Sequence, residues 1–279
     1  KINITGEGNL TFAKVIGGYN HFVALKANGT VWAYGDNTYG QLGQGNRVSA
    51  KKPVQVQNLT NIVSIAAGDN HAIAIDNLGN VYTWGLNSKG QLGNGTTQTV
   101  SIPEKITGLD NQMVKIAAGG NLSAIIDSTG DVYVFGDNSK EQIEEFKYNY
   151  DQYGQKIMPP LNMYVTQPVK VQTIENAVKV QCLQTGIVVL KTDESVERIT
   201  KYASQTKAQK ETIATGEMVD ISGTNESVVL LDKNGESYTY GDNSKGQAGI
   251  GGTSANVTLK KVQMVDAKTY LAIGAGYKN

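Results

Sequence analysis

The sequence predicts an all-β propeller, and three observations support this fold class. One phrase of short strands and glycine turns recurs along the chain. The 279 residues include 32 Gly and 14 Tyr but only 5 Pro, which favours many short strands joined by tight turns. The longest apolar runs, Ile187–Leu190 and Val228–Leu231, are much shorter than the roughly 20 residues of a membrane helix. We therefore expect residues 1–279 to form one β-rich domain without a membrane span.

The repeat is clearest in its second copy. A strand at Ile62–Ala67 leads through Gly-Asp-Asn to a strand at His71–Asp76, and a glycine turn leads to Val81–Trp84. With a fourth strand at Glu104–Thr107, each copy supplies the four strands of one propeller blade. The repeat length of roughly 50 residues is typical of propellers and longer than that of leucine-rich or helical repeats.

The other copies have their strands and turns in the same order and match the repeat motif to different degrees. The first, third and fifth copies begin their first strands near Val15, Ile116 and Ile221. The fourth copy, at about residues 177–217, is degenerate but keeps its apolar rhythm, and a partial sixth opens at Tyr270–Gly276. The third strand of four copies ends in a glycine that we expect to be a structural repeat position: Gly35, Gly85, Gly136 and Gly241.

Aromatic residues alternate along the third strands, so that each pair shares one face of its strand. We expect these flat side chains to fill the wedge between adjacent blades rather than to bind ligands. The pairs are Trp32 with Tyr34, Tyr82 with Trp84, Tyr133 with Phe135, and Tyr238 with Tyr240.

The phrases Gly-x-Asn-His-x-x-Ala-Ile/Leu, Gly-x-Val-Tyr-x-Trp-Gly and Gly-Gln-Leu-Gly resemble those of RCC1 (regulator of chromosome condensation) repeats. The resemblance covers nearly the whole chain, and the chain is similar to bacterial RCC1-like propellers. Members of this family usually close a ring of seven blades. The resemblance thus implies that five copies and a partial sixth form either part of such a ring or a smaller closure.

Charge and cysteine content limit the classes of partner. The 25 Lys and Arg balance the 25 Asp and Glu, so the broad positive field that attracts nucleic acid is absent, and we expect no nucleic-acid partner. Cys182 is the single cysteine, which excludes an internal disulfide and a cysteine zinc cluster. We expect its thiol to pack as a small, inert hydrophobe.

His21 and His71, the two histidines, occupy the same repeat position, which indicates a structural role in bonding the local turn rather than a metal site or a catalytic triad. The glycine pair Gly35 and Gly40 is followed by Gln where a phosphate loop needs Lys. No nucleophile elbow, zinc-protease pair or dinucleotide fingerprint occurs in the sequence. We therefore expect no enzyme activity, no catalytic residue, no metal and no cofactor.

An insertion at about residues 140–167 interrupts the third copy. It mixes aromatic residues with Asn, Gln and Lys, as antibody paratopes do, and long loops on rigid scaffolds often carry binding. The alternative is that it covers the side of the propeller or an exposed strand edge. The candidate partner-binding residues are Phe146, Tyr148, Tyr150, Tyr153, Met158 and Tyr164.

The fourth copy ends in a charged tail from Arg198 to Glu217, in which basic and acidic residues nearly cancel. We expect this tail to be a solvated blade edge, since scattered surface lysines occur in any soluble protein. The chain begins at Lys1 with neither Met nor a signal peptide, and we expect it to be part of a larger protein.

These observations favour a non-catalytic protein-interaction module. The resemblance and the Asn, Lys, Thr and Tyr content suggest a bacterial secreted or surface protein, hence an extracellular or cell-surface location. Two alternatives are a proteinaceous enzyme inhibitor and a carbohydrate-binding propeller. A guanine-nucleotide exchange factor, the activity of the family's founding member, is less favoured because no matching set of residues is found.

Overall fold

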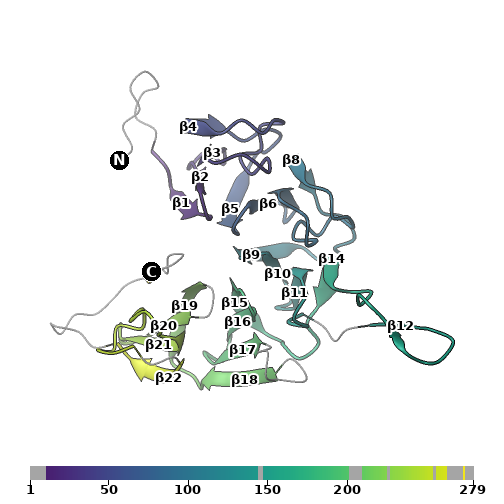
Figure 1. The fold of residues 1–279 in the computed structure, drawn as a ribbon. Coiled ribbons are helices and arrows are strands. Elements are labelled where there is room, and N and C mark those ends of the chain that lie inside the picture. Colours follow the sequence, from purple (N-terminus) through teal and green to yellow (C-terminus); the bar gives the residue numbers. More distant parts are fainter. Residues whose placement is uncertain are drawn as a thin grey trace.

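The computed structural model describes residues 11–143, 147–200, 209–224, 227–253, 256–262 and 273. Within these ranges every regular element is a β-strand. Five four-stranded antiparallel sheets are arranged as blades in an arc around a central axis (Figure 1). The all-β propeller predicted from the repeats is confirmed. In the same part of the chain, no helix has the length and apolar content of a membrane span.

Each blade takes its four strands in chain order, starting from the axis (Figure 1). Blade 1 contains β1 (Lys14–Gly17), β2 (His21–Leu25), β3 (Val31–Gly35) and β4 (Ala50–Gln55). Blade 2 contains β5 (Ile62–Ala67), β6 (His71–Asp76), β7 (Val81–Gly85) and β8 (Val100–Lys105). Blade 3 contains β9 (Met113–Gly119), β10 (Leu122–Asp127), β11 (Val132–Asp137) and β14 (Tyr164–Lys170).

Blade 4 contains β15 (Ala177–Leu183), β16 (Gly186–Lys191), β17 (Val196–Thr200) and β18 (Gln209–Ala214). Blade 5 contains β19 (Met218–Thr224), β20 (Ser227–Asp232), β21 (Ser237–Asp242) and β22 (Asn256–Lys261). The sixth copy expected at Tyr270–Gly276 lies outside the described residues, except for Ile273.

The outer strand of blade 2 differs from the prediction, which placed it at Glu104–Thr107. The strand is β8, and its pairing with β7 begins at Val100, opposite Gly85. A bulge between Thr83 and Gly85 shifts the register. The strand ends at Lys105, and the next residue, Ile106, donates its N–H to the carbonyl of Val81 at 2.9 Å and is buried in the core.

In blades 1, 2, 3 and 5, a glycine at the end of the third strand adopts a backbone conformation closed to most residues. Gly35 has a φ of 114°, and a Cβ there would lie 2.5 Å from the carbonyl oxygen of Asn20. The equivalent glycines Gly85, Gly136 and Gly241 also have positive φ, between 102° and 116°. A side chain at this position would both strain the backbone and clash with the preceding turn.

The hydrophobic core consists of the interfaces between successive blades. Each blade has a forward face, toward the next blade in the chain, and a backward face, toward the previous one. In the first interface, Val31 and Ala33 on the forward face of blade 1 pack in one buried cluster with Ile65 and Trp84 on the backward face of blade 2. Trp84 is fully buried, and its Nε1 donates a hydrogen bond to the carbonyl of Gln41 at 2.9 Å.

The third-strand aromatics fill these wedges where a preceding blade is present. Phe135 is fully buried between blades 2 and 3, and Tyr238 and Tyr240 pack between blades 4 and 5. On blade 1, the backward face has no blade against it among the described residues. Tyr34 there is only half-buried, and it stacks on Phe22 with ring centroids 5.0 Å apart.

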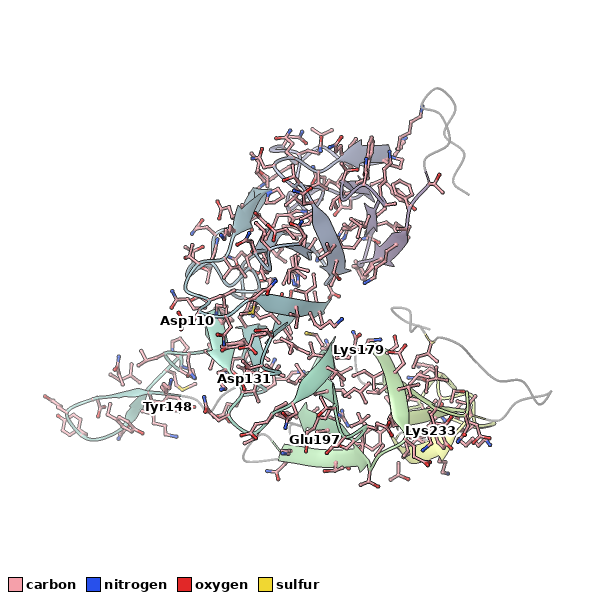
Figure 2. All side chains as sticks on the ribbon, turned by 180° about the vertical axis from the view of Figure 1, so that it is seen from behind. Asp110, Asp131, Tyr148, Lys179, Glu197 and Lys233 are labelled. Carbon is pink, nitrogen blue, oxygen red and sulfur yellow. The ribbon has the colours of Figure 1, made fainter. Side chains whose placement is uncertain are left out.

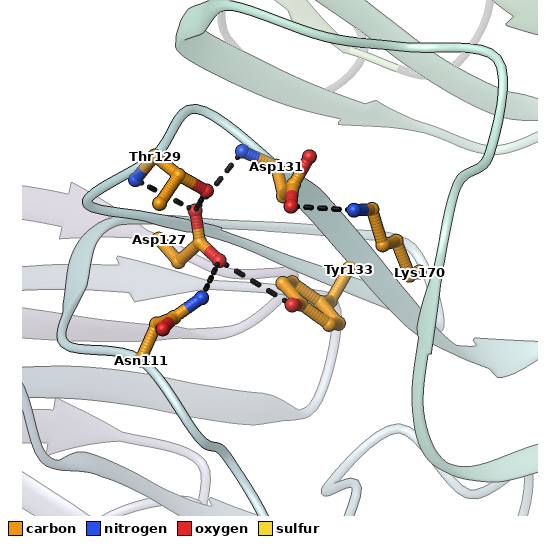
Figure 3. Close-up of polar contacts among 6 residues, drawn as sticks. All are labelled: Asn111, Asp127, Thr129, Asp131, Tyr133 and Lys170. Carbon is orange, nitrogen blue, oxygen red and sulfur yellow. Dashed lines mark hydrogen bonds and ion pairs between the residues drawn. The ribbon is translucent and has the colours of Figure 1, made fainter.

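A buried aspartate organises the turn between the second and third strands of several blades. In blade 3, Asp127 accepts hydrogen bonds from the backbone N–H and the hydroxyl of Thr129 at 2.9 and 2.7 Å, and from Asn111 at 2.8 Å (Figure 3). The hydroxyl of Tyr133 approaches the same carboxylate at 3.3 Å, and Lys170 pairs with Asp131 at 2.5 Å. Burial alone would raise the pKa of Asp127, but these hydrogen bonds outweigh it and lower the pKa.

The prediction of a solvated charged tail from Arg198 to Glu217 is wrong for Arg198, whereas Lys210, Glu211 and Glu217 are exposed as expected. Arg198 is 1% exposed and lies 5.2 Å from the ring centroid of Tyr240, in the interface with blade 5. Its neighbour Glu197 is also buried and pairs with Lys191 at 3.5 Å and Lys210 at 3.2 Å. The side chains alternate between the two faces of β17, so both charges enter blade interfaces rather than solvent.

Cys182 also lies in an interface, within the buried cluster between blades 3 and 4. Burial raises the pKa of its thiol, which keeps the thiol protonated and unreactive. The structure agrees with the expectation of a packed, inert cysteine.

Replacing Trp84 by Ala tests the contribution of the wedge aromatics. We expect Trp84→Ala to lower the free energy of unfolding by about 3–5 kcal/mol, since it empties a buried site between two blades. Tyr34→Ala, at the same repeat position on the open face of blade 1, should lower it by less than half as much. Urea denaturation followed by circular dichroism measures both, and equal losses would contradict the role assigned to the blade interface.

Candidate functional site

The insertion in the third copy forms a separate β-hairpin that projects outward from blade 3 (Figure 1). Its strands are β12 (Asn149–Tyr150) and β13 (Lys156–Ile157), which pair only with each other among the described residues. Figure 2 shows Tyr148 on this projecting segment, away from the blades. The insertion therefore extends from the propeller rather than lying along the side of the blades.

The tip of the hairpin is a tight turn held by Asp151. One carboxylate oxygen of Asp151 accepts hydrogen bonds from the backbone N–H groups of Tyr153 and Gln155, both at 2.9 Å. Gly154, with a φ of 75°, donates its N–H to the carbonyl of Asp151 at 3.0 Å. These bonds give the exposed tip a defined shape.

The base of the hairpin is tied to the blade through Asn138 and Asn162. The side chain of Asn138 donates to the carbonyl of Asn162 at 3.0 Å and accepts from the N–H of Ile143 at 2.8 Å. The Asn162 side chain accepts from the N–H of Lys147 at 2.7 Å. In blade 1, Asn37 accepts from Leu42 in the same way, so the regular blade loop continues to Ile143.

This geometry corrects the predicted bounds of the insertion. Residues 140–143 complete the blade loop, and Tyr164 to Gln167 belong to β14. The extra segment therefore occupies residues 144–161. The sequence-based bounds of 140–167 were too wide because the degenerate Gln-Ile at 142–143 keeps the bonding of Gln-Leu in the other copies.

The predicted binding residues divide into three groups. Tyr150, Tyr153 and Met158 are exposed on the hairpin, with 58%, 78% and 66% of their surface accessible. Tyr148 is half-buried, with the Lys156 ammonium 4.3 Å from its ring centroid. Phe146 lies outside the described residues.

Tyr164 lies apart from the hairpin, so it does not contribute to the same surface. It is the first residue of β14, and its hydroxyl accepts a hydrogen bond from the Lys89 Nζ at 3.1 Å. The same ammonium lies 4.5 Å from the ring centroid. Tyr164 thus connects blade 3 to blade 2, and its predicted role in partner binding stays a prediction, separate from the hairpin tyrosines.

The sequence reasoning missed two exposed aliphatic residues of the hairpin, Ile157 and Leu161. It selected aromatic residues and methionine as anchors and passed over aliphatic side chains in the same insertion. The position of these apolar residues within an otherwise polar loop could have identified them from the sequence. Together with Tyr150, Tyr153 and Met158, they form an exposed apolar group that we call the hairpin surface.

The two histidines occupy equivalent positions but do not make the same hydrogen bonds. The His71 Nε2 lies 2.9 Å from the hydroxyl of Ser123 in the next blade. That hydroxyl donates to the carbonyl of Gln91 at 2.9 Å, so Nε2 carries the proton and donates. For His21 the equivalent of Ser123 is Ala72, and among the described residues neither ring nitrogen of His21 has a hydrogen-bond partner.

The prediction that both histidines bond their own turns is therefore wrong, since the position reaches across the blade interface. Burial lowers the pKa of His21 to about 4. Burial and the nearby His21 lower the pKa of His71 to about 3. Both rings are neutral at pH 7. In the described ranges, no group of three or more His, Cys, Asp or Glu residues is placed to hold a metal ion.

Comparisons with known proteins agree with the repeat pattern. One model of the regulator of chromosome condensation (RCC1) repeat matches residues 28–75 and 79–126, and a second matches 13–41, 62–91 and 113–142. The "Protein RCC2 homolog" of Danio rerio is 43% identical over 65 residues, which are 23% of this chain and 13% of that protein.

Solved structures show the same fold. Human WBSCR16 has a TM-score of 0.77 at 21% identity, with 91% of this chain and 67% of that chain covered. Prp20p from Saccharomyces cerevisiae has a TM-score of 0.75 at 18% identity, with 94% and 67% covered. The chain thus spans about two thirds of the length of these solved chains and a small part of the curated relative.

The buried histidines predict a loss of stability in acid. The native state keeps His21 neutral down to about pH 4, whereas the unfolded chain binds a proton below about pH 6.5. Stability from this site is full above pH 6.5 and falls by about 3 kcal/mol as the pH drops to 4. Urea denaturation should show a smaller loss between pH 7 and pH 4 for His21→Gln than for the unaltered chain. The same loss in both proteins would contradict the neutral, buried state of His21.

Proposed function

We propose that this chain, an RCC1-repeat β-propeller, is a non-catalytic scaffold that binds another protein through the hairpin surface. A repeated and closely packed set of blades provides a rigid support, and loops can vary on it without disturbing the core. The hairpin is the largest departure from the repeat within the described residues. Its two strands add no pairing to any blade.

The observation that carries the proposal is an exposed apolar group on a hairpin fixed at both tip and base. An isolated two-stranded hairpin has marginal stability in water, yet this one is held by the Asp151 turn and by Asn162. Tyrosines bury a large area while losing few side-chain torsions, so Tyr150 and Tyr153 suit a binding surface. Scattered exposed apolar residues are ordinary, but here five lie within the twelve residues 150–161.

The solved relatives support a protein as the partner. The structure of Prp20p is described with its binding properties to Gsp1p and histones, and yeast RCC1 (Prp20) has been solved bound to Kap60. The net charge of zero in this chain gives no general attraction to nucleic acid. From the protein partners of these solved structures and the net charge of zero, we infer that this chain also binds a protein.

We further propose that this chain is part of a bacterial secreted or surface protein. This part of the proposal rests on residue composition and on the family resemblance alone. An enzyme could be the bound partner, in which case the chain would act as an inhibitor through the same surface. Carbohydrate binding would instead use stacking on exposed aromatic rings. Binding on a glycan array that survives loss of the hairpin surface would favour the carbohydrate alternative.

The double variant Tyr150→Ser/Tyr153→Ser tests the proposal. A central interface tyrosine contributes up to about 2 kcal/mol, so we expect the pair to reduce affinity for the captured partner by about 30-fold or more. The melting temperature should not change, since both side chains are mostly exposed. Partners are captured from the source organism by cross-linking at the hairpin, and affinity is measured by biolayer interferometry.

A control variant removes two exposed apolar side chains elsewhere. Val48 and Leu78 are each 72% exposed and lie on loops of blades 1 and 2. We expect Val48→Ser/Leu78→Ser to leave affinity unchanged. Equal affinity of the tyrosine variant and the unaltered chain, or an equal loss in the control, would place the interaction elsewhere.

A further inference from the structure

The innermost strands of the blades surround a cavity of about 1000 Å³ at the axis of the propeller. Residues of β1, β5, β9, β15 and β19 line it, and the ribbon view shows these strands converging on the centre (Figure 1). Its size falls at the upper end of the range for small-molecule sites, roughly 300–1000 Å³. We call this cavity the axial channel.

Three of the four lining residues at one repeat position are lysines. In blade 5 the residue at this position is Asp220, which is not among the lining residues. In blades 1 to 4 the position holds Lys14, Ser64, Lys115 and Lys179. Each is paired with the equivalent residue of the second strand in its own blade. The four side chains therefore leave their strands at the same level, from the same face.

Nearby acidic groups compensate only part of this positive charge. Lys179 forms an ion pair with Asp220 of blade 5, and Figure 2 shows Lys179 at the inner side of the blades. Lys14 donates a hydrogen bond to the carbonyl of Ile65 at 3.3 Å, an uncharged partner. Within the described residues Lys115 has no ion pair, and Asp69 is the only carboxylate among the residues lining the channel.

The remaining ammonium groups repel each other. The pKa of Lys14 is lowered, first by its partial burial and then by the positive charges of Lys179 and Lys115. The pKa of Asp69 is raised by burial, so its carboxylate is disfavoured in this environment. An anion between the lysines would relieve the repulsion.

We propose that the axial channel binds a compact anion that carries several phosphate groups. Lys14 and Lys115 flank Ser64 on three successive blades, so donors from three blades line one cavity, which favours an anion with several phosphate groups. Ammonium groups and a hydroxyl are good donors to phosphate oxygens. Linear tripolyphosphate and inositol hexakisphosphate share this chemistry but differ in shape. The volume of about 1000 Å³ is large enough for either compound.

Isothermal titration of the purified chain with each compound tests the proposal. We expect saturable binding to one site per chain for at least one compound, with affinity that falls as salt is added, because the contacts are ionic. The stronger of the two ligands indicates whether a linear chain or a ring of phosphates fits the channel. Sulfate at equal ionic strength should not compete.

The variant Lys14→Gln/Lys115→Gln removes the two lysines beside Ser64 and leaves the Lys179 and Asp220 pair intact. We expect it to weaken binding by at least about tenfold, since each lysine would contribute a charge-assisted hydrogen bond. The control Lys51→Gln/Lys52→Gln removes the same charge from β4 at the outer edge of blade 1. It should change affinity by less than about threefold, since screening weakens distant charges.

Absence of saturable binding by both compounds would overturn the proposal, as would equal weakening by the two lysine variants. Melting temperatures of both variants establish that the fold is retained. The hairpin variant Tyr150→Ser/Tyr153→Ser should bind the anion as the unaltered chain does. Anion binding and partner binding therefore succeed or fail independently.

Discussion

The rest of the structure depends on the packing of each blade against the next. A single four-stranded sheet of this chain has apolar side chains on both faces, and packing against a neighbouring blade buries them. The forward face of one blade and the backward face of the next form each buried cluster. Large rings such as Trp84 and Phe135 fill the wedge that the twisted sheets leave between them. Burial of these faces is the main source of stability.

This dependence explains why equivalent residues have different surroundings. Trp84 and Tyr34 share a repeat position, but Tyr34 lacks a preceding blade in the described structure and is only half-buried. His71 reaches Ser123 across one interface, whereas the residue equivalent to Ser123 for His21 is Ala72, and the His21 ring has no hydrogen-bond partner among the described residues. Blade 4 replaces an aromatic pair by Glu197 and Ile199 and places Arg198 on the opposite face. Each environment is decided by two blades together.

The two proposed sites lie outside this packing. The hairpin surface projects from the perimeter and adds no strand to a blade, while the axial channel is bounded by the edges of the inner strands. Substitutions in either place leave the buried apolar clusters between the blades intact. A repeat scaffold of this kind can therefore present different ligands with separate surfaces at its rim and its axis, because the core lies between them.

The sequence by itself determined the blade order, the positions of most strands and the glycine turns, since these depend on local periodicity and on backbone conformations that favour Gly. It also indicated the insertion and the exposed residues Tyr150, Tyr153 and Met158. Only the tertiary structure decided that Tyr164 joins blade 2, that Arg198 is buried, and that Lys14, Lys115 and Lys179 meet in one channel. Those contacts join residues from different blades, and their distances depend on how the sheets are placed around the axis, which no local pattern records.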